Sequence, residues 1–172
     1  MQGDAFDAQA HRGVVETLKN YPDINVVAEI YTDWTGSKAQ SELASLLPSL
    51  KVKIDGVITQ GGDSYAAVQA FRQAGLDLPI IGGDNRGYFL KWWASEAPEG
   101  YDTISVSANP WDGATAVYVA VDILNGMNVP KKMVHPFGIV TADEVKNFKN
   151  VPDEDIACPT YDREWVRKNL YK

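Results

Sequence analysis

Apolar residues follow two alternating patterns along this chain. Stretches typical of amphipathic helices cover about residues 7–20, 35–50, 64–75, 88–94 and 111–126. Runs rich in β-branched residues lie between or after them, at about residues 25–31, 56–59, 78–82, 103–107 and 135–140. Helices that alternate with short apolar strands are typical of βα units. The pattern predicts an α/β fold of three layers, a mainly parallel sheet with helices on both faces.

Polar residues and glycines mark where these helices begin and end. Asp7 is the predicted cap of the first helix, and Asp63 or Ser64 caps the helix that follows the 56–59 strand. Gly75 lies at the C-terminal end of that helix, where a left-handed residue is expected. The region after the 111–126 helix is less regular and ends in a short basic helix.

Composition and charge exclude several classes of protein. The 172 residues are 45% hydrophobic and 23% charged, which is typical of a globular domain and not of a disordered chain. The net charge of −7 opposes binding to nucleic acid or to an anionic membrane through bulk charge. No apolar run approaches the roughly 20 residues of a membrane-spanning helix. One cysteine, Cys158, and two histidines predict neither a disulfide nor a metal site, and Met1–Asp4 lacks the features of a signal peptide.

Polar side chains follow the predicted strands, where α/β sheets bind their ligands. They belong to the segments Thr32–Trp34, Gln60–Asp63, Asp84–Arg86 and Ser107–Asn109. Carboxylates and amides that bind hydroxyl groups, with one flat aromatic ring, suit a neutral polyhydroxy ligand. The same residue types also serve as turn and cap residues in βα loops, so this pattern alone leaves both interpretations open.

The sequence contains no established catalytic motif. It has no Gly-x-Ser-x-Gly elbow, no Walker loop and no Gly-x-Gly-x-x-Gly. Three carboxylates follow strands, and they could form a divalent-metal or phospho-acceptor pocket: Asp33, Asp63 and Asp84. This leaves a flavodoxin-like, aspartate-dependent enzyme as one alternative.

A series of short motifs resembles one known family. The chain resembles the C-terminal part of type I periplasmic sugar-binding proteins, the ribose-binding group of transporter receptors. The resemblance covers nearly the whole length, and it rests on the order of these motifs: Gly3-x-x-x-Asp7-x-x-x-x-Arg12-Gly13, Tyr21-Pro22-x-Ile24-x-Val26, Asp33-Trp34, Ile54-Asp55-Gly56-Val57, Ala74-Gly75, Pro79-Ile80-Ile81-Gly82-Gly83-Asp84, Asn109-Pro110-x-x-Gly113 and Ile139-Val140-Thr141-x-x-x-Val145.

The resemblance implies a particular organisation. Members of the family have two α/β lobes joined by a three-strand hinge, and they hold the sugar between the lobes. Residues 1–113 would then form the C-terminal lobe without its first strand. Residues 114–172 would form a returning segment, a hinge strand and the C-terminal tail. The chain looks like a truncation product or an engineered piece of such a receptor.

The resemblance also implies which residues hold the sugar. Trp34 matches the aromatic residue that stacks on the sugar ring, and Asp84 matches an aspartate that pairs with sugar hydroxyls. Gln60 or Asp63 falls where the family has an Asn-Asp pair, and Ser107 or Asn109 falls near a glutamine that binds hydroxyls. Ala10 stands where the family has its binding arginine, and the adjacent Gln9 is the substitute for it. No catalytic residue, cofactor or metal is implied.

The first functional hypothesis is therefore a non-catalytic, periplasmic solute-binding protein of an ABC importer. It would close around a monosaccharide or polyol and dock on a membrane permease, without binding nucleic acid. The second is the effector domain of a lactose-repressor-type regulator, which shares the fold. The missing helix-turn-helix and the acidic charge oppose this second hypothesis.

The predicted helix at 111–126 also implies an assembly. It is apolar around most of its circumference, so we expect it to be covered on more than one side. We predict a homodimer, with or without exchange of the segment after Gly113 between copies. The alternative is a monomer in which this helix folds back on the chain's own sheet.

Overall fold

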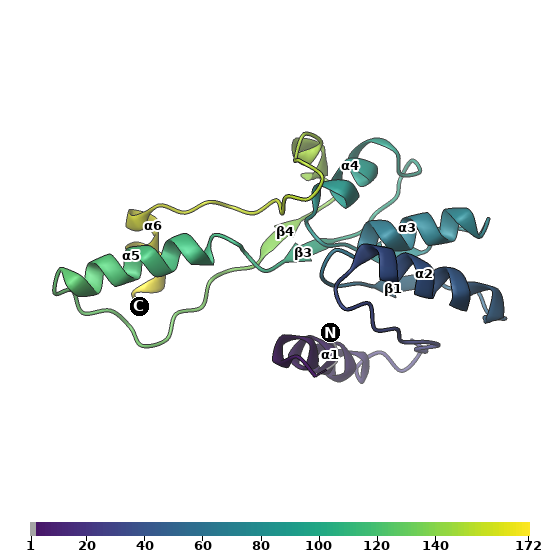
Figure 1. The fold of residues 1–172 in the computed structure, drawn as a ribbon, viewed down its shortest axis with the longest axis horizontal. Helices are drawn as coiled ribbons and strands as arrows, with labels where there is room; N and C mark the ends of the chain where they lie inside the picture. The colour runs from purple at the N-terminus through teal and green to yellow at the C-terminus, as the bar shows by residue number, and fades with distance from the viewer. Residues whose placement is uncertain (1–2) are drawn as a thin grey trace. The chain divides into compact units, whose positions relative to one another are not determined.

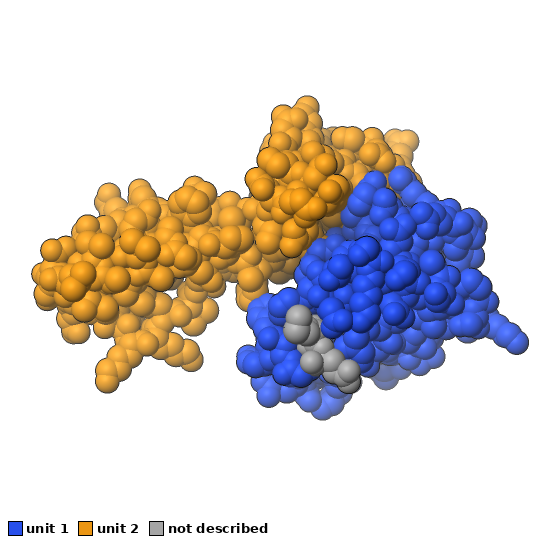
Figure 2. All heavy atoms as spheres, in the orientation of Figure 1, with its two compact units in different colours: residues 1–81 blue, residues 82–172 orange. Residues whose placement is uncertain are grey.

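The computed structural model describes residues 3–172, and its contacts divide the chain into two compact units. The first unit comprises residues 1–81 and the second comprises residues 82–172 (Figure 2). Within the described residues, none of the helices combines the length and apolar character needed to span a membrane. The expected end of the C-terminal lobe at residue 113 refers to the lobes of a whole receptor, not to these two units, and it stays a prediction.

The first unit alternates helices with short strands (Figure 1). Strands β1 and β2 are hydrogen-bonded neighbours, and the N–H of Ile80 donates to the carbonyl of Asp55 at 3.0 Å. From α2 onward, this is the α/β alternation that the apolar pattern predicts. In chain order the elements are α1 (Ala5–Leu18), α2 (Gly36–Leu46), the 3-10 turn η1 (Leu47–Ser49), β1 (Gly56–Ile58), α3 (Ser64–Gln73) and β2 (Ile80–Gly82).

Helix α3 ends where the sequence predicts. Gly75 has φ +66°, its N–H donates to the carbonyl of Arg72, and the N–H of Leu76 donates to the carbonyl of Phe71. These two bonds form a Schellman motif, which needs a left-handed residue at the position of Gly75. The predicted helix end is confirmed.

Helices α2 and α3 pack together over the apolar core of the first unit. The buried centre consists of Leu47, Ala70 and Phe71, and the partly buried residues around it are Leu43, Ile54, Val57 and Leu78. These side chains come from α2, η1, α3 and the strand region, so one core joins the elements that precede the functional loops.

Two local predictions for the first unit are wrong. Residues 25–31 form no strand, although they are rich in β-branched residues, and Val26 is 57% exposed. Such residues favour a strand only where neighbours cover them and pair with them. Asp4, not Asp7, caps α1, because its side chain accepts from the N–H groups of Phe6 and Asp7 at 2.8 and 3.2 Å. Asp7 is thereby left for another role.

The second unit is also α/β, but one of its strand pairs is antiparallel. Gly83 forms a parallel bridge with Ser105, whereas β3 pairs antiparallel with β4, with Ser105 opposite Val140 and Ser107 opposite Gly138. The α/β class is confirmed. The antiparallel pair was not expected, and it forms because the chain returns after α5 and runs alongside β3 in the opposite direction. The elements are α4 (Gly87–Ser95), β3 (Ser105–Ser107), α5 (Asp112–Leu124), β4 (Gly138–Val140), the 3-10 turn η2 (Val145–Phe148) and α6 (Arg163–Leu170).

Aromatic residues of α4 form a buried cluster in the second unit. Phe89 and Trp92 are at most 1% exposed, and the ring of Trp92 meets that of Tyr101 edge-on at 5.1 Å between centroids. Gly87 lies so close to the chain that a Cβ there would fall 2.0 Å from the carbonyl oxygen of Pro152. Trp92 and Trp93 are 1% and 6% exposed, so this pair of adjacent tryptophans packs inside the protein.

A buried carboxylate joins α5 to α6. Asp122 is fully buried and accepts hydrogen bonds from the guanidinium groups of Arg163 and Arg167 and from the hydroxyl of Tyr171, at 2.8 Å from Arg163 Nε and 2.8 Å from Tyr171. The hydrogen bond from Arg167, followed by those from Arg163 and Tyr171, holds the pKa of Asp122 well below its usual range. The two helices are therefore held together by charged hydrogen bonds.

The apolar side chains of α5 are largely exposed. Leu124 is 85% exposed, Val117 60% and Ile123 53%, whereas the buried residues of this helix are Thr115 and Asp122. Much of the apolar circumference expected from the sequence therefore faces outward.

The Asp122 contact predicts how the second unit responds to mutation and to acid. Asp122→Asn leaves two guanidinium groups without their carboxylate, so α6 should detach, and its amide protons should lose protection from hydrogen exchange. Asp143→Asn, at an exposed position, is the control. Unchanged protection of α6 in Asp122→Asn would contradict the assignment.

Acid should have the same effect on the wild type. The folded-state pKa of Asp122 lies below its ordinary value of 3.8, so its contribution to stability is present above about pH 4 and is lost as the pH falls further. The difference in unfolding free energy between the wild type and Asp122→Asn should therefore shrink below pH 4. Denaturant titrations of both proteins at pH 7 and at pH 2.5 measure this difference in unfolding free energy. The same difference at the two pH values would count against the prediction.

The exposed face of α5 keeps the predicted homodimer open to test. Light scattering at tens of micromolar protein should give twice the 18.9 kDa monomer mass. Val117→Lys, which places a charge on this face, should shift the mass toward the monomer. The monomer mass for the unmodified chain would exclude the dimer.

Candidate functional site

The predicted site residues are divided between the two units. Gln9, Trp34, Gln60 and Asp63 belong to the first unit, and Asp84, Ser107 and Asn109 belong to the second. Each set is described within its own unit.

Trp34 sits in a strained turn. Among the described residues, it and Asp33 are the non-glycine residues with positive φ, +60° and +53°. The left-handed region is unfavourable for residues with a Cβ, so the surroundings must hold the turn in place. Thr32 does so, because its carbonyl accepts from the N–H of Thr35 at 3.0 Å and its hydroxyl oxygen accepts from the N–H of Trp34 at 3.3 Å.

An ion pair supports the same turn from outside. Lys38 donates to the carboxylate of Asp33 at 2.7 Å, and both side chains are substantially exposed. This hydrogen bond lowers the pKa of Asp33 and raises that of Lys38. Asp33 is thus engaged with Lys38, and among the described residues no group of three or more Asp, Glu, His or Cys side chains could hold a metal ion.

The indole of Trp34 packs against a backbone that only glycine allows. A Cβ on Gly61 would lie 2.8 Å from Cγ of Trp34, and Gly61 itself has φ +67°. Phe6 meets the indole edge-on, with centroids 6.0 Å apart and an interplanar angle of 89°. The ring is therefore held by the 61–62 turn and by α1.

Two polar contacts join the segments that hold Trp34, one partly buried and one buried. Gln60 Nε2 donates to Oδ1 of Asp7 at 2.5 Å, and the hydroxyl of Thr32 donates to the carboxylate of Asp63. Asp7 is 8% exposed and Asp63 6%. Thr32 thus connects Asp63 to the turn that carries the tryptophan, and Gln60 adjoins the glycine beneath the ring.

Two atoms in this group lack a hydrogen-bond partner within the described part of the chain. They are the indole Nε1 of Trp34, a donor, and Oε1 of Gln60, an acceptor, and both are buried. Buried polar atoms in native proteins nearly always have a partner, so these two are available to a ligand or to water.

Gln9 does not join this group. It is exposed on α1, two residues after Asp7, which places it about 200° around the helix from that buried carboxylate. The structure brings Trp34, Gln60 and Asp63 together and leaves Gln9 on another face.

In the second unit, Asp84 and Ser107 are linked through Asn85. Asp84 is 5% exposed, and its Oδ1 accepts from the N–H of Arg86 at 3.0 Å. The hydroxyl of Ser107 accepts from the N–H of Asn85 at 2.9 Å. These two predicted residues therefore lie on neighbouring strand ends of one unit.

Asn85 is a buried hub that the sequence indicates only as part of a turn. Its Nδ2 donates to the carbonyls of Gly138 and Ala157, both at 3.0 Å, and its Oδ1 accepts from the hydroxyl of Ser105 at 2.7 Å. It is fully buried and joins three segments that lie far apart in the sequence. No local pattern signals such a role.

Asn109 is occupied by contacts within the protein. Its Nδ2 donates to the carbonyl of Pro159 at 3.1 Å, and its Oδ1 accepts from the N–H of Trp111 at 2.9 Å. These bonds fix the entry to α5 and attach the C-terminal segment. Both polar atoms of the Asn109 side chain are thus engaged within the protein.

Sequence reasoning missed Asp7 and Phe6 as neighbours of Trp34. Asp7 was expected to cap α1, and Phe6 had no expected role. A signal was present, because Asp4 follows Gly3 and is an equally good cap, which places Asp7 at the third position of the helix with its carboxylate free of that duty.

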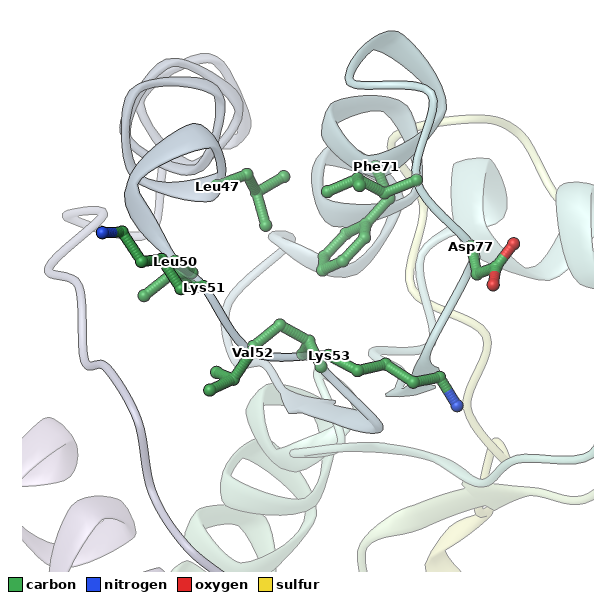
Figure 3. A pocket seen from close by; sticks show the side chains of 9 residues that line it. Leu47, Leu50, Lys51, Val52, Lys53, Phe71 and Asp77 are labelled. Atoms are coloured by element: carbon green, nitrogen blue, oxygen red, sulfur yellow. The ribbon is translucent and has the colours of Figure 1, made fainter.

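A separate hollow in the first unit contains none of the predicted site residues. It has a volume of about 300 Å³ and lies beside the core (Figure 3). Aliphatic residues and two lysines dominate its wall, which consists of Leu47, Leu50, Lys51, Val52, Lys53, Ile54, Phe71, Leu76 and Asp77.

Comparison with known proteins identifies the family. The profile described as the periplasmic binding protein domain matches residues 1–128. The xylitol-binding protein of Mycolicibacterium smegmatis (strain ATCC 700084 / mc(2)155) is 32% identical over 84 residues, which are 48% of this chain and 24% of that protein.

Solved structures of solute-binding proteins share the fold. An ABC transporter solute binding protein from Thermobispora bispora DSM 43833 is 26% identical, with a TM-score of 0.85 over 95% of this chain and 50% of that one. An ABC transporter periplasmic solute binding protein from Actinobacillus succinogenes 130z with bound D-allose is 20% identical, with a TM-score of 0.73 over 86% of this chain and 52% of that one. This chain spans about half the length of these solved relatives, and the match to the xylitol-binding protein covers about a quarter of that protein. The chain belongs to the periplasmic binding protein domain family.

Proposed function

We propose that this chain forms the C-terminal lobe of a solute receptor that delivers a monosaccharide or polyol to an ABC importer. The lobe supplies one wall of the binding cleft and performs no catalysis. Residues 1–113 make up this lobe, and residues 114–172 form the returning segment, hinge strand and tail. The receptor works outside the cytoplasm, in the periplasm, and docks on a membrane permease.

One observation carries the proposal. Trp34 is held in a strained left-handed turn, its ring packs on Gly61, and the buried Nε1 has no partner within the described residues. Strain of this kind persists where the surroundings over-determine it, and it is concentrated at functional sites. A fixed indole suits stacking on the C–H face of a sugar.

The polar groups beside Trp34 suit a neutral polyhydroxy ligand. Gln60 offers a buried acceptor and the indole N–H a buried donor, so one ligand hydroxyl can satisfy both kinds of atom. In the second unit, Asp84 and Ser107 offer a carboxylate and a hydroxyl. Two relatives agree with this ligand class, because one is a xylitol-binding protein and the other is a solute binding protein with bound D-allose.

The isolated chain should bind sugars weakly. A receptor of this type surrounds its ligand with two lobes, and one lobe offers about half of the contacts. Loss of several hydrogen bonds at about 1 kcal/mol each moves a micromolar Kd to millimolar or beyond. Titration calorimetry with xylitol and D-allose measures the Kd of the isolated chain, and a micromolar Kd for either ligand would contradict the expectation.

Trp34 and Asp84 should dominate binding in a receptor that carries both lobes. Trp34→Ala removes the stacking surface, and Asp84→Ala leaves ligand hydroxyls unpaired, each at a cost of roughly 1.5–3 kcal/mol, or more than tenfold in Kd. Asp23→Ala, at an exposed position, should leave Kd unchanged. Wild-type affinity in both site variants would mean that the site lies elsewhere.

Filling the space at Gly61 should also reduce ligand binding. Gly61→Ala places a Cβ 2.8 Å from the Trp34 ring, so the ring must move. Gly75→Ala is a matched control, because Gly75 has nearly the same φ, +66°, but nothing within 4 Å of its added Cβ. Both variants should lose about 1 kcal/mol of stability from the left-handed backbone.

Only Gly61→Ala should, in addition, weaken sugar binding. Thermal unfolding and ligand titration on the two variants separate the effects. Equal affinities in the two variants would show that the position of the Trp34 ring does not matter for the ligand.

A further inference from the structure

We propose that Asp7 is a positioning residue that orients the side-chain amide of Gln60 and thereby makes the site require a hydroxyl donor from its ligand. This inference deepens the proposed function and rests on it, because it assigns a role at the same sugar or polyol site. Asp7 acts through Gln60, with no contact to the ligand.

The contact between the two side chains is tertiary and partly buried. Gln60 Nε2 donates to Asp7 Oδ1 at 2.5 Å across 53 positions of sequence, from the segment after β1 to α1. Asp7 is 8% exposed, and Oε1 of Gln60 is buried. A bond in such surroundings is worth more than one in water, and it restrains both partners.

The carboxylate dictates which way the amide points. A glutamine amide carries a donor and an acceptor of nearly equal shape, and its last torsion has two similar wells, so an unrestrained amide can turn over. An ionised carboxylate only accepts hydrogen bonds. Facing Asp7, Gln60 must present its NH₂ group, and Oε1 must point elsewhere.

Asp7 is available for this role because Asp4 caps α1. The side chain of Asp4 accepts from the N–H groups of both Phe6 and Asp7. An acidic residue at the third helical position commonly turns back to the cap, but here the Asp7 side chain reaches Gln60. Its neighbour Phe6 contacts Trp34, so α1 approaches both site residues.

The consequence is a fixed polarity at the ligand site. Gln60 contributes an acceptor, and the indole Nε1 of Trp34 contributes a donor. Ligand hydroxyl groups can donate to the first and accept from the second, whereas hydrogen or fluorine in place of a hydroxyl cannot donate. The site should therefore favour polyols and sugars over their deoxy and fluoro derivatives at one position.

The orientation can be tested first without a ligand. In ¹⁵N-labelled chain, the side-chain NH₂ of Gln60 should show one slowly exchanging, downfield proton. Asp7→Ala should abolish this signal, and Asp7→Glu should restore it at least in part. A Gln60 NH₂ signal that is the same in the wild type and in Asp7→Ala would overturn the inference.

Titration with xylitol and D-allose up to about 100 mM, followed at the Trp34 indole N–H, tests the consequence. Asp7→Asn is the decisive variant, because asparagine keeps the size of the side chain but accepts either orientation of the Gln60 amide. We expect the preference for xylitol over its monodeoxy derivatives to fall about tenfold in Asp7→Asn, the loss of one hydrogen-bond discrimination. Gln60→Ala should lose the same preference, and adding Asp7→Asn to it should change nothing further.

The outcomes separate the two proposals. If no sugar shifts the Trp34 signal while the Gln60 amide still depends on Asp7, the proposed function fails and the orientation stands. If xylitol binds and the preference in Asp7→Asn equals that of the wild type, the inference fails and the proposed function stands. Should Asp7→Ala unfold α1, as judged from the α1 amide signals, Asp7→Asn and Asp7→Glu decide the matter.

Discussion

The site in the first unit depends on one constraint, the left-handed turn at Asp33 and Trp34. Two consecutive residues with a Cβ do not adopt this backbone unless other contacts hold it. Thr32 does this from inside, since its hydroxyl oxygen accepts from Trp34 while its proton goes to Asp63. Gly61 lets the indole lie against the backbone. The position of the ring thus follows from contacts between the 32–34 turn and the 61–63 segment, and a fixed position of this kind is what a preorganised binding surface requires.

In the second unit, some polar groups hold the fold together, and others are those that we propose contact the ligand. Asn85 and Asn109 direct their amides to backbone carbonyls and to neighbouring groups, so both residues hold strand ends and loops in place. Ser107 receives the N–H of Asn85, and this places its side chain beside the loop of Asp84. The residue type does not separate the two roles, because asparagine, serine and aspartate serve equally well in each. The inventory of hydrogen-bond partners separates them.

Local patterns predicted most of this fold, and long-range contacts account for what they missed. The helices follow from apolar spacing, and the end of α3 at Gly75 follows from backbone sterics. Both are properties of a few consecutive residues. The 25–31 segment was predicted wrongly as a strand because pairing partners are not a local property. Gln60 and Asp84 could be found as residues that follow strands, and Trp34 as one that follows a run rich in β-branched residues. The partly buried contact between Asp7 and Gln60 could not, because it joins positions 53 apart. The periodicity of apolar residues along the sequence does not predict such a contact.

Helix α5 inverts the usual distribution of side chains, and the reason lies in how it is held. Its fully buried residue is Asp122, whose bonds to Arg163, Arg167 and Tyr171 attach α6. Because these charged hydrogen bonds hold the helix pair, the exposed apolar residues of α5 are not needed for that attachment. An apolar face that folding leaves in water gains free energy only when another surface covers it. The packing of α5 within the unit and its association with any further surface are therefore governed by different side chains, and each can change without the other.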